Sequence, residues 1–392
     1  MPKPEINLLD REFWKSRQHE AWTWCRANDP VYFDEHSGIW AITKHADIIH
    51  VERHDEIFSS EGAYRLNPSP GEANMIAADD PQHLKQRRLV NRGFTPSAVD
   101  TWNPHFDKLL DSMIEPLTPA GQCEVVEALA GQLPARFTCA LLGMPDDQWP
   151  VVKVWSEKLM RIDAMTMDND AITGMMEANQ ELYMMLMEKV PEMKACPVGD
   201  GLLSKWAHST IDGEPMSAEQ IHHETGLFVA GGAETTRTAI AHGLRTFCDH
   251  NDQWEALYAD SSLMVSAVDE VIRWVTPLNN MFRRVTTDTE LNGKSLKAGD
   301  RVALVYPSGN RDEDVFDDPF TFDITRSPNP HVAFGHGTHF CIGRNFARRE
   351  LEMLFGKLNQ AWTDLRVVAE IDVEPNIFAP AVRSFVMGFA SR

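Results

Sequence analysis

The sequence predicts a mainly α-helical protein with a small β-sheet region, an α+β fold. Apolar residues recur at helical spacing from Ser217 to about Cys248, a run of roughly thirty residues that makes a helix of about 45 Å. Residues 100–200 also follow helical spacing, with breaks at prolines and glycines. The strand-like segments are short and flank turns, so they predict only a minor β region.

Composition bounds the class of protein. With 392 residues, 43% of them hydrophobic, the chain can bury a large core as one large domain or two smaller ones. No segment has the composition of a linker, and we expect a single domain over residues 1–392. The net charge of -21 argues against nucleic acid as a partner.

Two features predict the cellular compartment. The N-terminus has no apolar run of the length of a signal peptide or a membrane anchor. The six cysteines have no paired spacing, which suits a reducing cytoplasm better than a disulfide framework. We therefore expect a cytoplasmic protein without a membrane anchor. The cysteines are Cys25, Cys123, Cys139, Cys196, Cys248 and Cys341.

The N-terminal part predicts four segments. They are a helix over residues 11–26, a β-hairpin of strands 31–33 and 39–42, a helix over 44–51 and an irregular stretch over 59–80. A loop as long as the last one is uncommon inside a compact domain unless it binds something.

A basic helix is predicted over residues 81–92, with Pro81 at the favoured first position. His83 and Arg87 are four residues apart and therefore share one face. Taken alone, the segment is best interpreted as a solvated basic helix.

Methionine is concentrated between residues 160 and 193, which hold nine of the eighteen methionines. Because the side chain is flexible and polarisable, such a stretch can line a surface that adapts to bulky apolar ligands. Filling of the core would produce the same pattern.

The long helix predicted from Ser217, where Ser217 and Gln220 form a capping box, has an unusual centre. Residues 230–236, AGGAETT, combine two glycines, two threonines and one acid. Each glycine costs about 1 kcal/mol in a helix interior, which indicates either a function or a close helix–helix contact. Small residues let a flat ligand approach the backbone, and a local opening of the helical hydrogen bonds would make room for water.

The later part predicts one structural ion pair and three small β segments. Glu270 and Arg273 lie three residues apart on a predicted helix, among apolar residues. Asn292-Gly293 predicts a hairpin turn and residues 301–305 a strand. Residues 376–389 predict a hairpin whose tip lines a binding pocket.

The segment over residues 330–344 carries the strongest chemical signal. Gly335 and Gly337 allow the backbone to turn tightly and approach a flat ligand. Cys341 would project from the start of a helix over residues 342–358, where backbone N–H groups and the helix dipole favour a thiolate. A thiolate held in this way is a good axial ligand for haem iron.

The same segment is compatible with two further roles for Cys341. It could be a buried structural cysteine in a glycine turn. It could also belong to a zinc site, because His331, His336 and His339 lie close by, although no second Cys/His pair at zinc-knuckle spacing occurs.

At these residues the sequence resembles the cytochrome P-450 family. The family signature Phe-x-x-Gly-x-x-x-Cys-x-Gly is met by Phe334, Gly337, Cys341 and Gly343. Motifs near residues 83, 234, 270 and 341 occur in the family's order, so the resemblance spans nearly the whole chain. It implies a triangular-prism fold with haem b (iron protoporphyrin IX) between the long central helix and the cysteine-loop helix.

The resemblance implies a role for each candidate residue. Cys341 would be the axial thiolate on the haem iron. The propionates would be bound by His83, Arg87, His339 and Arg283, with Arg284 leaving the last assignment open by one place. Further contacts to the haem would come from Gly232, Phe334, Gly335, Ile342 and Gly343.

The Glu270–Arg273 pair is similar to the family's Glu-x-x-Arg pair, which bonds the segment before the haem loop. Arg311 resembles its usual third partner.

The resemblance extends to the oxygen-binding pattern of small residue, glycine, acid and threonine, matched by Gly231, Gly232, Glu234 and Thr235. Splitting dioxygen consumes two protons, so Thr235 is the candidate proton-donating hydroxyl and Glu234 the candidate relay to solvent. Relatives that use peroxide lack this pair, so its presence implies the use of dioxygen and external electrons.

The implied activity is a haem-thiolate monooxygenase that inserts one atom of dioxygen into a bulky hydrophobic substrate. The pattern is similar to actinobacterial members that oxidise sterol side chains, which favours a steroid or terpenoid; a fatty-acid or polyketide hydroxylase is the alternative. A haem-binding sensor without turnover would need Cys341 but neither Glu234 nor Thr235, and an enzyme acting on a peroxide substrate is disfavoured for the same reason.

Electrons would come from NAD(P)H through a ferredoxin reductase and a ferredoxin-type donor, because no flavin or iron–sulfur segment is found. A basic set near the cysteine is the predicted dock for an acidic ferredoxin. It comprises Lys85, Arg87, Arg88, Arg92, Arg344, Arg348 and Arg349.

Overall fold

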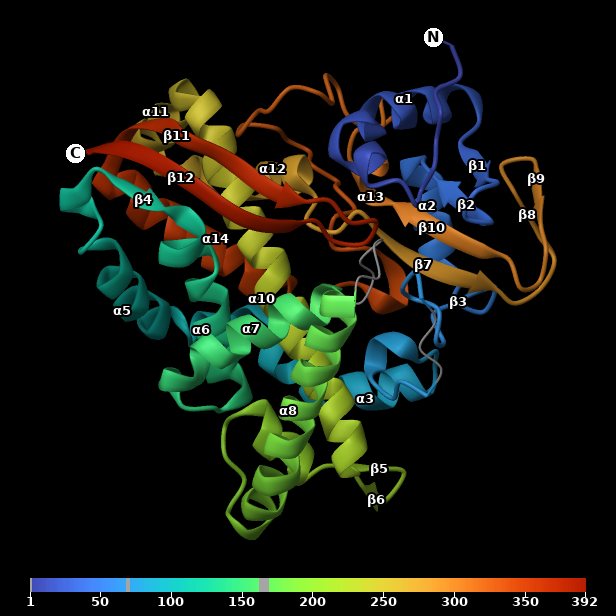
Figure 1. The fold of residues 1–392 in the computed structure, drawn as a ribbon, viewed down its shortest axis with the longest axis horizontal. Helices are drawn as coiled ribbons and strands as arrows, with labels where there is room; N and C mark the ends of the chain where they lie inside the picture. The colour runs from blue at the N-terminus through green and yellow to red at the C-terminus, as the bar shows by residue number, and fades with distance from the viewer. Residues whose placement is uncertain (1, 68–70, 162–168) are drawn as a thin grey trace.

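The computed structural model describes residues 2–67, 71–161 and 169–392. Its outline is triangular, with helices on the left and below and a small sheet on the right (Figure 1). The prediction of a mainly helical fold with minor sheets is confirmed. None of the helices within the described ranges has the length and apolar character needed to cross a membrane.

Helices provide most of the framework. The α-helices are α1 (Gln18–Asn28), α2 (His45–Arg53), α3 (Gln82–Val90), α4 (Pro96–Asp100), α5 (Asn103–Ile114), α6 (Gln132–Leu142), α7 (Trp149–Met160), α8 (Asn169–Ala195), α9 (Leu202–Ala207), α10 (Ala218–Asp249), α11 (Asn251–Ala259), α12 (Met264–Val275), α13 (Tyr306–Gly309) and α14 (Arg344–Ala361). A π-helical turn (Phe13–Arg17) precedes α1, so the predicted N-terminal helix is confirmed with a local change of winding.

The larger sheet is mixed and has the strand order β1-β2-β10-β7-β3. Its strands are β1 (Val31–Asp34), β2 (Ile39–Ile42), β3 (Phe58–Ser59), β7 (Asn280–Val285) and β10 (Arg301–Val305). Strands β10 and β2 run parallel, and the other neighbours are antiparallel. The predicted hairpin over residues 31–42 and the predicted strand over residues 301–305 are confirmed.

A three-stranded antiparallel sheet joins the C-terminus to the middle of the chain, in the order β11-β12-β4. It consists of β4 (Gln122–Glu124), β11 (Trp362–Glu374) and β12 (Ala381–Ser391). The predicted C-terminal hairpin is therefore longer than the pattern indicated, and its tip lies at residues 375–380. Two further hairpins pair β5 (Thr210–Ile211) with β6 (Glu214–Pro215), and β8 (Thr289–Leu291) with β9 (Lys294–Leu296).

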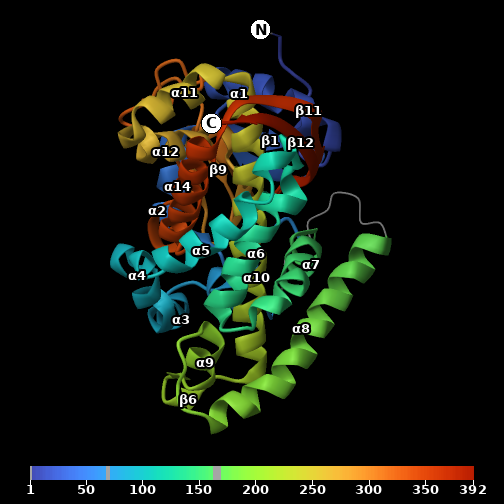
Figure 2. The same cartoon turned by 90° about the vertical axis from the view of Figure 1, so that its left-hand side faces the viewer.

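Helix α10 crosses the molecule and organises the other helices (Figures 1 and 2). Its first turn is closed by the predicted capping box, in which the Ser217 hydroxyl accepts from the Gln220 N–H at 3.1 Å and the Gln220 side chain accepts from the Ser217 N–H at 2.9 Å. The helix packs against α6, α7, α8 and α12. Fully buried side chains such as Ile240 and Phe247 each contribute about 1.5–3 kcal/mol through burial.

The centre of α10 differs from the prediction. The helix is continuous through residues 230–236, so the predicted opening of its hydrogen bonds is wrong. The Thr235 hydroxyl instead donates to the Gly231 carbonyl at 3.0 Å. This bond satisfies the hydroxyl within the helix itself, by sharing a carbonyl with the backbone.

The Glu270–Arg273 pair is the buried clamp that the sequence predicted. Both side chains are completely buried and are joined by two hydrogen bonds of 2.7 Å. Arg273 also donates to carbonyls at Asn310, Pro319 and Thr321, and Glu270 accepts from the Asn329 side chain at 3.1 Å. The clamp therefore fixes the segment that leads into the cysteine loop.

The predicted third partner of this clamp was wrong. Arg326, not Arg311, places its Nε 3.2 Å from a carboxylate oxygen of Glu270. Arg311 instead donates to the Trp274 carbonyl at 2.8 Å, and its guanidinium lies over the Trp274 ring. Sequence distance could not separate the two arginines because the intervening segment is irregular.

Candidate haem site

A cavity of about 250 Å³ separates the middle of α10 from the loop before α14. Its wall is largely apolar and includes Phe94, Phe137, Leu227, Phe228, Met281 and Phe378. Most of the predicted site residues border it, although they come from separate parts of the chain. These are His83, Arg87, Gly232, Thr235, Arg283, Phe334, Gly335, His339, Cys341, Ile342 and Gly343.

The cysteine loop is held by a backbone hydrogen bond and by two glycine turns. The Cys341 N–H donates to the Phe334 carbonyl at 2.9 Å. Gly335 and Gly337 have φ values of +67° and +66°, and a Cβ on Gly337 would lie 2.1 Å from the Glu52 carbonyl oxygen. Glycine is therefore required there by the backbone angle and by close contact with α2, which the sequence did not predict.

The surroundings of Cys341 shift the pKa of its thiol in opposite directions. Burial raises the pKa of Cys341, whereas the N–H groups of Gly343 and Arg344 and the cationic side chains of Arg87 and Arg344 lower it. Helix α14 begins at Arg344, two residues later than predicted, so the sulfur faces the first N–H groups of the helix. A metal cation bound to the sulfur would shift the equilibrium between thiol and thiolate to the thiolate, because coordination deprotonates a thiol.

Four basic side chains lie together at one edge of the cavity, namely His83, Arg87, Arg283 and His339. The rings of His83 and His339 lie 4.4 Å apart, and the buried Nε2 atom of each has no hydrogen-bond partner among the described residues. Burial lowers the pKa of both imidazoles and of Arg87. A ligand that carries carboxylates is suited to this edge, because it would pair with the guanidinium groups and would favour the protonated imidazoles, whose Nε2–H groups could then donate to it.

The choice between Arg283 and Arg284 follows from the alternation of side chains along β7. Arg283 is 4% exposed and borders the cavity, whereas Arg284 is exposed to solvent. Successive residues of a strand point to opposite faces. The Arg283 Nη2 atom lies 3.9 Å from Glu52 Oε1, and burial raises the pKa of that carboxyl to about 7.

The two glycines of α10 serve different purposes. A Cβ on Gly231 would meet nothing within 4 Å, so this position leaves open space on the cavity side. A Cβ on Gly232 would lie 2.9 Å from Thr138 Oγ1 on α6. Gly232 therefore permits close helix packing, and Gly231 permits a flat ligand to approach the backbone.

Thr235 and Glu234 point in different directions, because successive residues of a helix are rotated by about 100°. Thr235 borders the cavity, but Glu234 faces a second cavity of about 10 Å³ shared with Glu157, Arg161 and Glu374. That space has room for roughly one water molecule. Burial raises the pKa of Glu234, and Arg237, 3.4 Å away, lowers it.

The zinc alternative is not supported by the positions of the three histidines. His331 lies 3.8 Å from Asp269, His336 accepts a hydrogen bond from Arg53 at 3.0 Å, and the His339 ring is tilted against that of His83. Within the described parts of the chain, no group of three or more His, Cys, Asp or Glu side chains could hold a metal ion.

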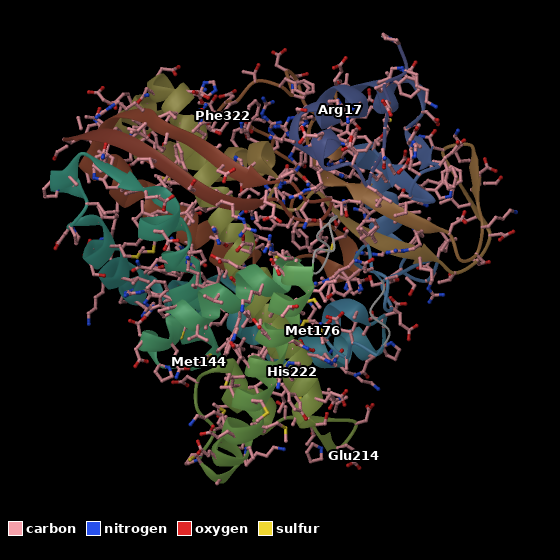
Figure 3. The ribbon with its side chains drawn as sticks, in the orientation of Figure 1. Arg17, Met144, Met176, Glu214, His222 and Phe322 are labelled. Atoms are coloured by element: carbon pink, nitrogen blue, oxygen red, sulfur yellow. The ribbon has the colours of Figure 1, made fainter. Side chains whose placement is uncertain are left out.

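The methionine stretch contributes less to the cavity than the sequence suggested. Among its described methionines, Met160 alone borders the cavity, and Met176 on α8, labelled in Figure 3, is 62% exposed. Met165 and Met167 lie outside the described residues, as does part of the irregular loop at 68–70.

Several cavity residues were missed by the sequence analysis. Phe94, Phe137 and Phe346 form an aromatic wall, with ring centroids 4.6 Å apart for Phe137 and Phe346. Tyr64 and Arg65, by contrast, come from the irregular loop whose length predicted a binding role, so the sequence indicated their segment but not the individual residues. The aromatic residues come from different elements, so no spacing pattern could have connected them.

Comparison with known proteins identifies the class. The family model for cytochrome P-450 matches residues 144–363. A steroid C26-monooxygenase of Mycolicibacterium smegmatis is 36% identical over 392 residues, covering 99% of this chain and 97% of the relative. A methyl-branched lipid omega-hydroxylase of Mycobacterium bovis is 33% identical, covering 94% and 92%. The chain belongs to the cytochrome P-450 family.

Solved structures agree in fold. A Mycobacterium marinum cytochrome P-450 in complex with pseudoionone has a TM-score of 0.91 and 30% identity, over 99% of both chains. A Bacillus megaterium cytochrome P-450 in complex with testosterone has a TM-score of 0.88 and 26% identity, over 97% of this chain and 99% of that one. The protein is thus a haem-dependent monooxygenase acting on hydrophobic substrates.

The residues around the cavity fit haem. The cavity offers a sulfur ligand on one side and the open position at Gly231 on the other. The buried imidazole nitrogens of His83 and His339, which lack partners among the described residues, lie where carboxylate groups of a macrocycle could satisfy them.

Proposed function

We propose that this protein hydroxylates a bulky lipid, with a steroid or terpenoid favoured, and receives electrons from NAD(P)H through a ferredoxin reductase and a ferredoxin. The observation that carries the proposal is that Cys341 and the open position at Gly231 on α10 border the same apolar cavity from opposite sides. Similarity to a steroid C26-monooxygenase supports the steroid class. Similarity to a methyl-branched lipid omega-hydroxylase supports a fatty-acid hydroxylase as the second candidate.

Each residue of the site has a proposed task. Haem held by the Cys341 thiolate supplies the activation of dioxygen. Arg87, Arg283, His83 and His339 bind and orient the propionates through charge-assisted hydrogen bonds. The contacts from Gly232, Phe334, Gly335, Ile342 and Gly343 shape the space around the macrocycle.

Protons are supplied from the α10 side. Thr235 holds its hydroxyl proton at the cavity wall, and its bond to the Gly231 carbonyl positions that hydroxyl. The neighbouring Glu234 borders the small second cavity, which has space for about one water, and burial raises the pKa of its carboxyl. A carboxyl whose pKa is raised toward the working pH is suited to relay protons from solvent.

The substrate class can be tested by titrating the ferric protein with three ligands without a free carboxylate, testosterone, pseudoionone and methyl hexadecanoate, while recording the haem absorbance. Displacement of water by a bound substrate moves the Soret band. We expect testosterone or pseudoionone to produce the larger shift at the lower concentration. A preference for methyl hexadecanoate would replace the steroid proposal by the fatty-acid one.

Replacement of Thr235 by alanine is expected to uncouple electron use from hydroxylation. NADH consumption should continue while product formed per NADH falls at least about tenfold and hydrogen peroxide accumulates, because a positioned proton donor contributes about 10²–10⁴-fold. Product and peroxide are measured in the same reconstituted reaction.

A matched control exists on the same helix. Thr225 donates to the Ile221 carbonyl at 2.6 Å in the same i to i−4 geometry but does not border the cavity. Thr225→Ala should leave coupling unchanged. Normal coupling in Thr235→Ala, or equal uncoupling in both variants, would reject the proton-donor role.

The proposed ferredoxin dock is smaller than the sequence suggested. Arg87 points into the cavity, Lys85 pairs with Asp212 at 2.6 Å, and Arg348 pairs with Asp269 at 2.7 Å. Arg349 is also paired, with Asp100. Arg88 and Arg92 are exposed, on the side of the molecule that carries α3, α4 and α14, opposite α8 (Figure 2).

Arg88→Glu combined with Arg92→Glu is expected to slow reduction by an acidic ferredoxin by about tenfold at low salt, with the difference shrinking as salt is added. The first-electron rate is followed by stopped flow. Lys194→Glu at the C-terminal end of α8, outside the predicted basic set, makes a control charge reversal. Reduction rates equal to the wild type in the double variant would exclude this dock.

A further inference from the structure

Arg65 lies in the wall of the haem cavity and brings a buried cation to it. The residue is 8% exposed and borders the cavity. Its guanidinium carbon lies 5.0 Å from the Tyr64 ring centroid and 5.6 Å from that of Phe378. The cation is thus held between two aromatic faces inside a mostly apolar surface, where its charge is little screened by water.

Arg65 comes from a different segment of the chain than the basic cluster proposed to bind the haem propionates. That cluster comes from α3, β7 and the cysteine loop. Phe378, against which Arg65 packs, belongs to the tip of the β11–β12 hairpin and forms a buried apolar cluster with Met160, Ala230 and Ala379. Met160 ends α7 and Ala230 lies on α10, so Arg65 stands on the side of the cavity formed by α10 and the hairpin tip.

The backbone that carries Arg65 is fixed before any ligand arrives. The Phe282 N–H donates to the Tyr64 carbonyl at 3.0 Å. Arg301 donates to the carbonyls of Ala63, Arg65 and Leu66. The Tyr64 hydroxyl donates to Glu72 Oε1 at 2.7 Å. A positioned side chain loses little conformational freedom when it binds a ligand, which increases the affinity gained from the contact.

We propose that Arg65 binds a carboxylate of the substrate, so that the preferred substrates are apolar lipids that end in a carboxylate and are oxidised away from that end. A guanidinium offers a fork of donors that matches a carboxylate, and charge-assisted bonds are about twice as strong as neutral ones. Arg65 also interacts within the chain, and the carboxylate would add to those contacts. The inference rests on the proposed function and narrows its substrate class.

The test compares an acid with its own methyl ester, which differ in charge but hardly in apolar surface. Haem-loaded protein is titrated by calorimetry with 15-methylhexadecanoic acid and with its methyl ester. A second pair, 3-oxochol-4-en-24-oic acid and its methyl ester, distinguishes a ring system from a linear chain. We expect the acid of at least one pair to bind about tenfold or more tightly than its ester.

Variants assign that preference to Arg65. Arg65→Leu should weaken binding of the preferred acid by about 10- to 100-fold and leave its ester within about twofold. Arg65→Lys should recover part of the loss. Arg284 is an exposed arginine on the outer face of β7, and Arg284→Leu should leave the affinity for both ligands unchanged.

Three results would overturn the inference. The first is equal affinity of the wild-type protein for acid and ester in both pairs, which needs no variant. The second is that Arg65→Leu weakens binding of the acid and of its ester by the same factor. The third is a lower haem content in Arg65→Leu with the acid preference retained, since Arg65 would then bind a haem propionate. Because calorimetry needs no turnover, a failure of hydroxylation itself remains distinguishable from each of these.

Discussion

Cys341→Ser is expected to remove the red-shifted Soret peak that the reduced wild-type protein shows with carbon monoxide, together with all hydroxylation. The peak reports a thiolate opposite the bound gas, and a serine hydroxyl at this position is a far weaker ligand and stays protonated near neutral pH. The Phe334 carbonyl would still accept from the residue 341 N–H, since that bond is made by the backbone. The loop is therefore expected to fold while the metal chemistry is lost.

Cys248→Ser is the matched control for the spectrum. Cys248 is a half-buried free thiol on α10, and burial raises its pKa to about 12. It does not border the cavity, so the red-shifted peak should persist. Persistence of the peak in Cys341→Ser would mean that another sulfur binds the iron and would undo the assignment of the site.

Arg273→Leu is expected to destabilise the protein by about 3–5 kcal/mol, because it leaves the Glu270 carboxylate buried without its main partner. The variant also deprives the carbonyls of Asn310, Pro319 and Thr321 of a donor. Domains are typically stable by only about 5–15 kcal/mol. A large part of the protein should therefore unfold or lose haem, and the midpoint of urea unfolding measures the effect.

An exposed arginine on another helix provides the comparison. Arg88→Leu on α3 removes the same charge from the surface and should change the free energy of unfolding by less than about 0.5 kcal/mol. If the stability of Arg273→Leu stays within about 1 kcal/mol of the wild type, Arg326 must compensate for the lost partner through its own contact with Glu270. One of the two arginines alone would then be enough to hold Glu270.

The main elements of the fold were predictable because their signals are local. A capping box at Ser217, an Asn292-Gly293 turn and paired apolar runs at residues 31–42 each specify backbone conformation over a few residues. The Cys341 motif was equally readable, because the positive φ angles at Gly335 and Gly337 restrict those positions to glycine. Boundaries shifted by two residues at α14, where the first turn is set by tertiary contacts.

The methionine-rich stretch and the AGGAETT segment show where local patterns fail. Composition could not tell that Met176 faces solvent while Met160 faces the cavity. It also could not separate Gly231, which leaves space, from Gly232, which packs on Thr138. Both distinctions depend on which neighbouring helix lies against each face of the element.

By itself the sequence predicted Cys341 as the sulfur ligand and determined the long central helix and the order of the motifs, since each is encoded within a few consecutive residues. Tertiary structure decided which arginine meets Glu270, which of Arg283 and Arg284 enters the cavity, where Glu234 points, and that Arg65 joins the cavity wall. These outcomes depend on side chains brought together from distant segments, and the rotation of each helix and strand about its own axis sets which of them meet.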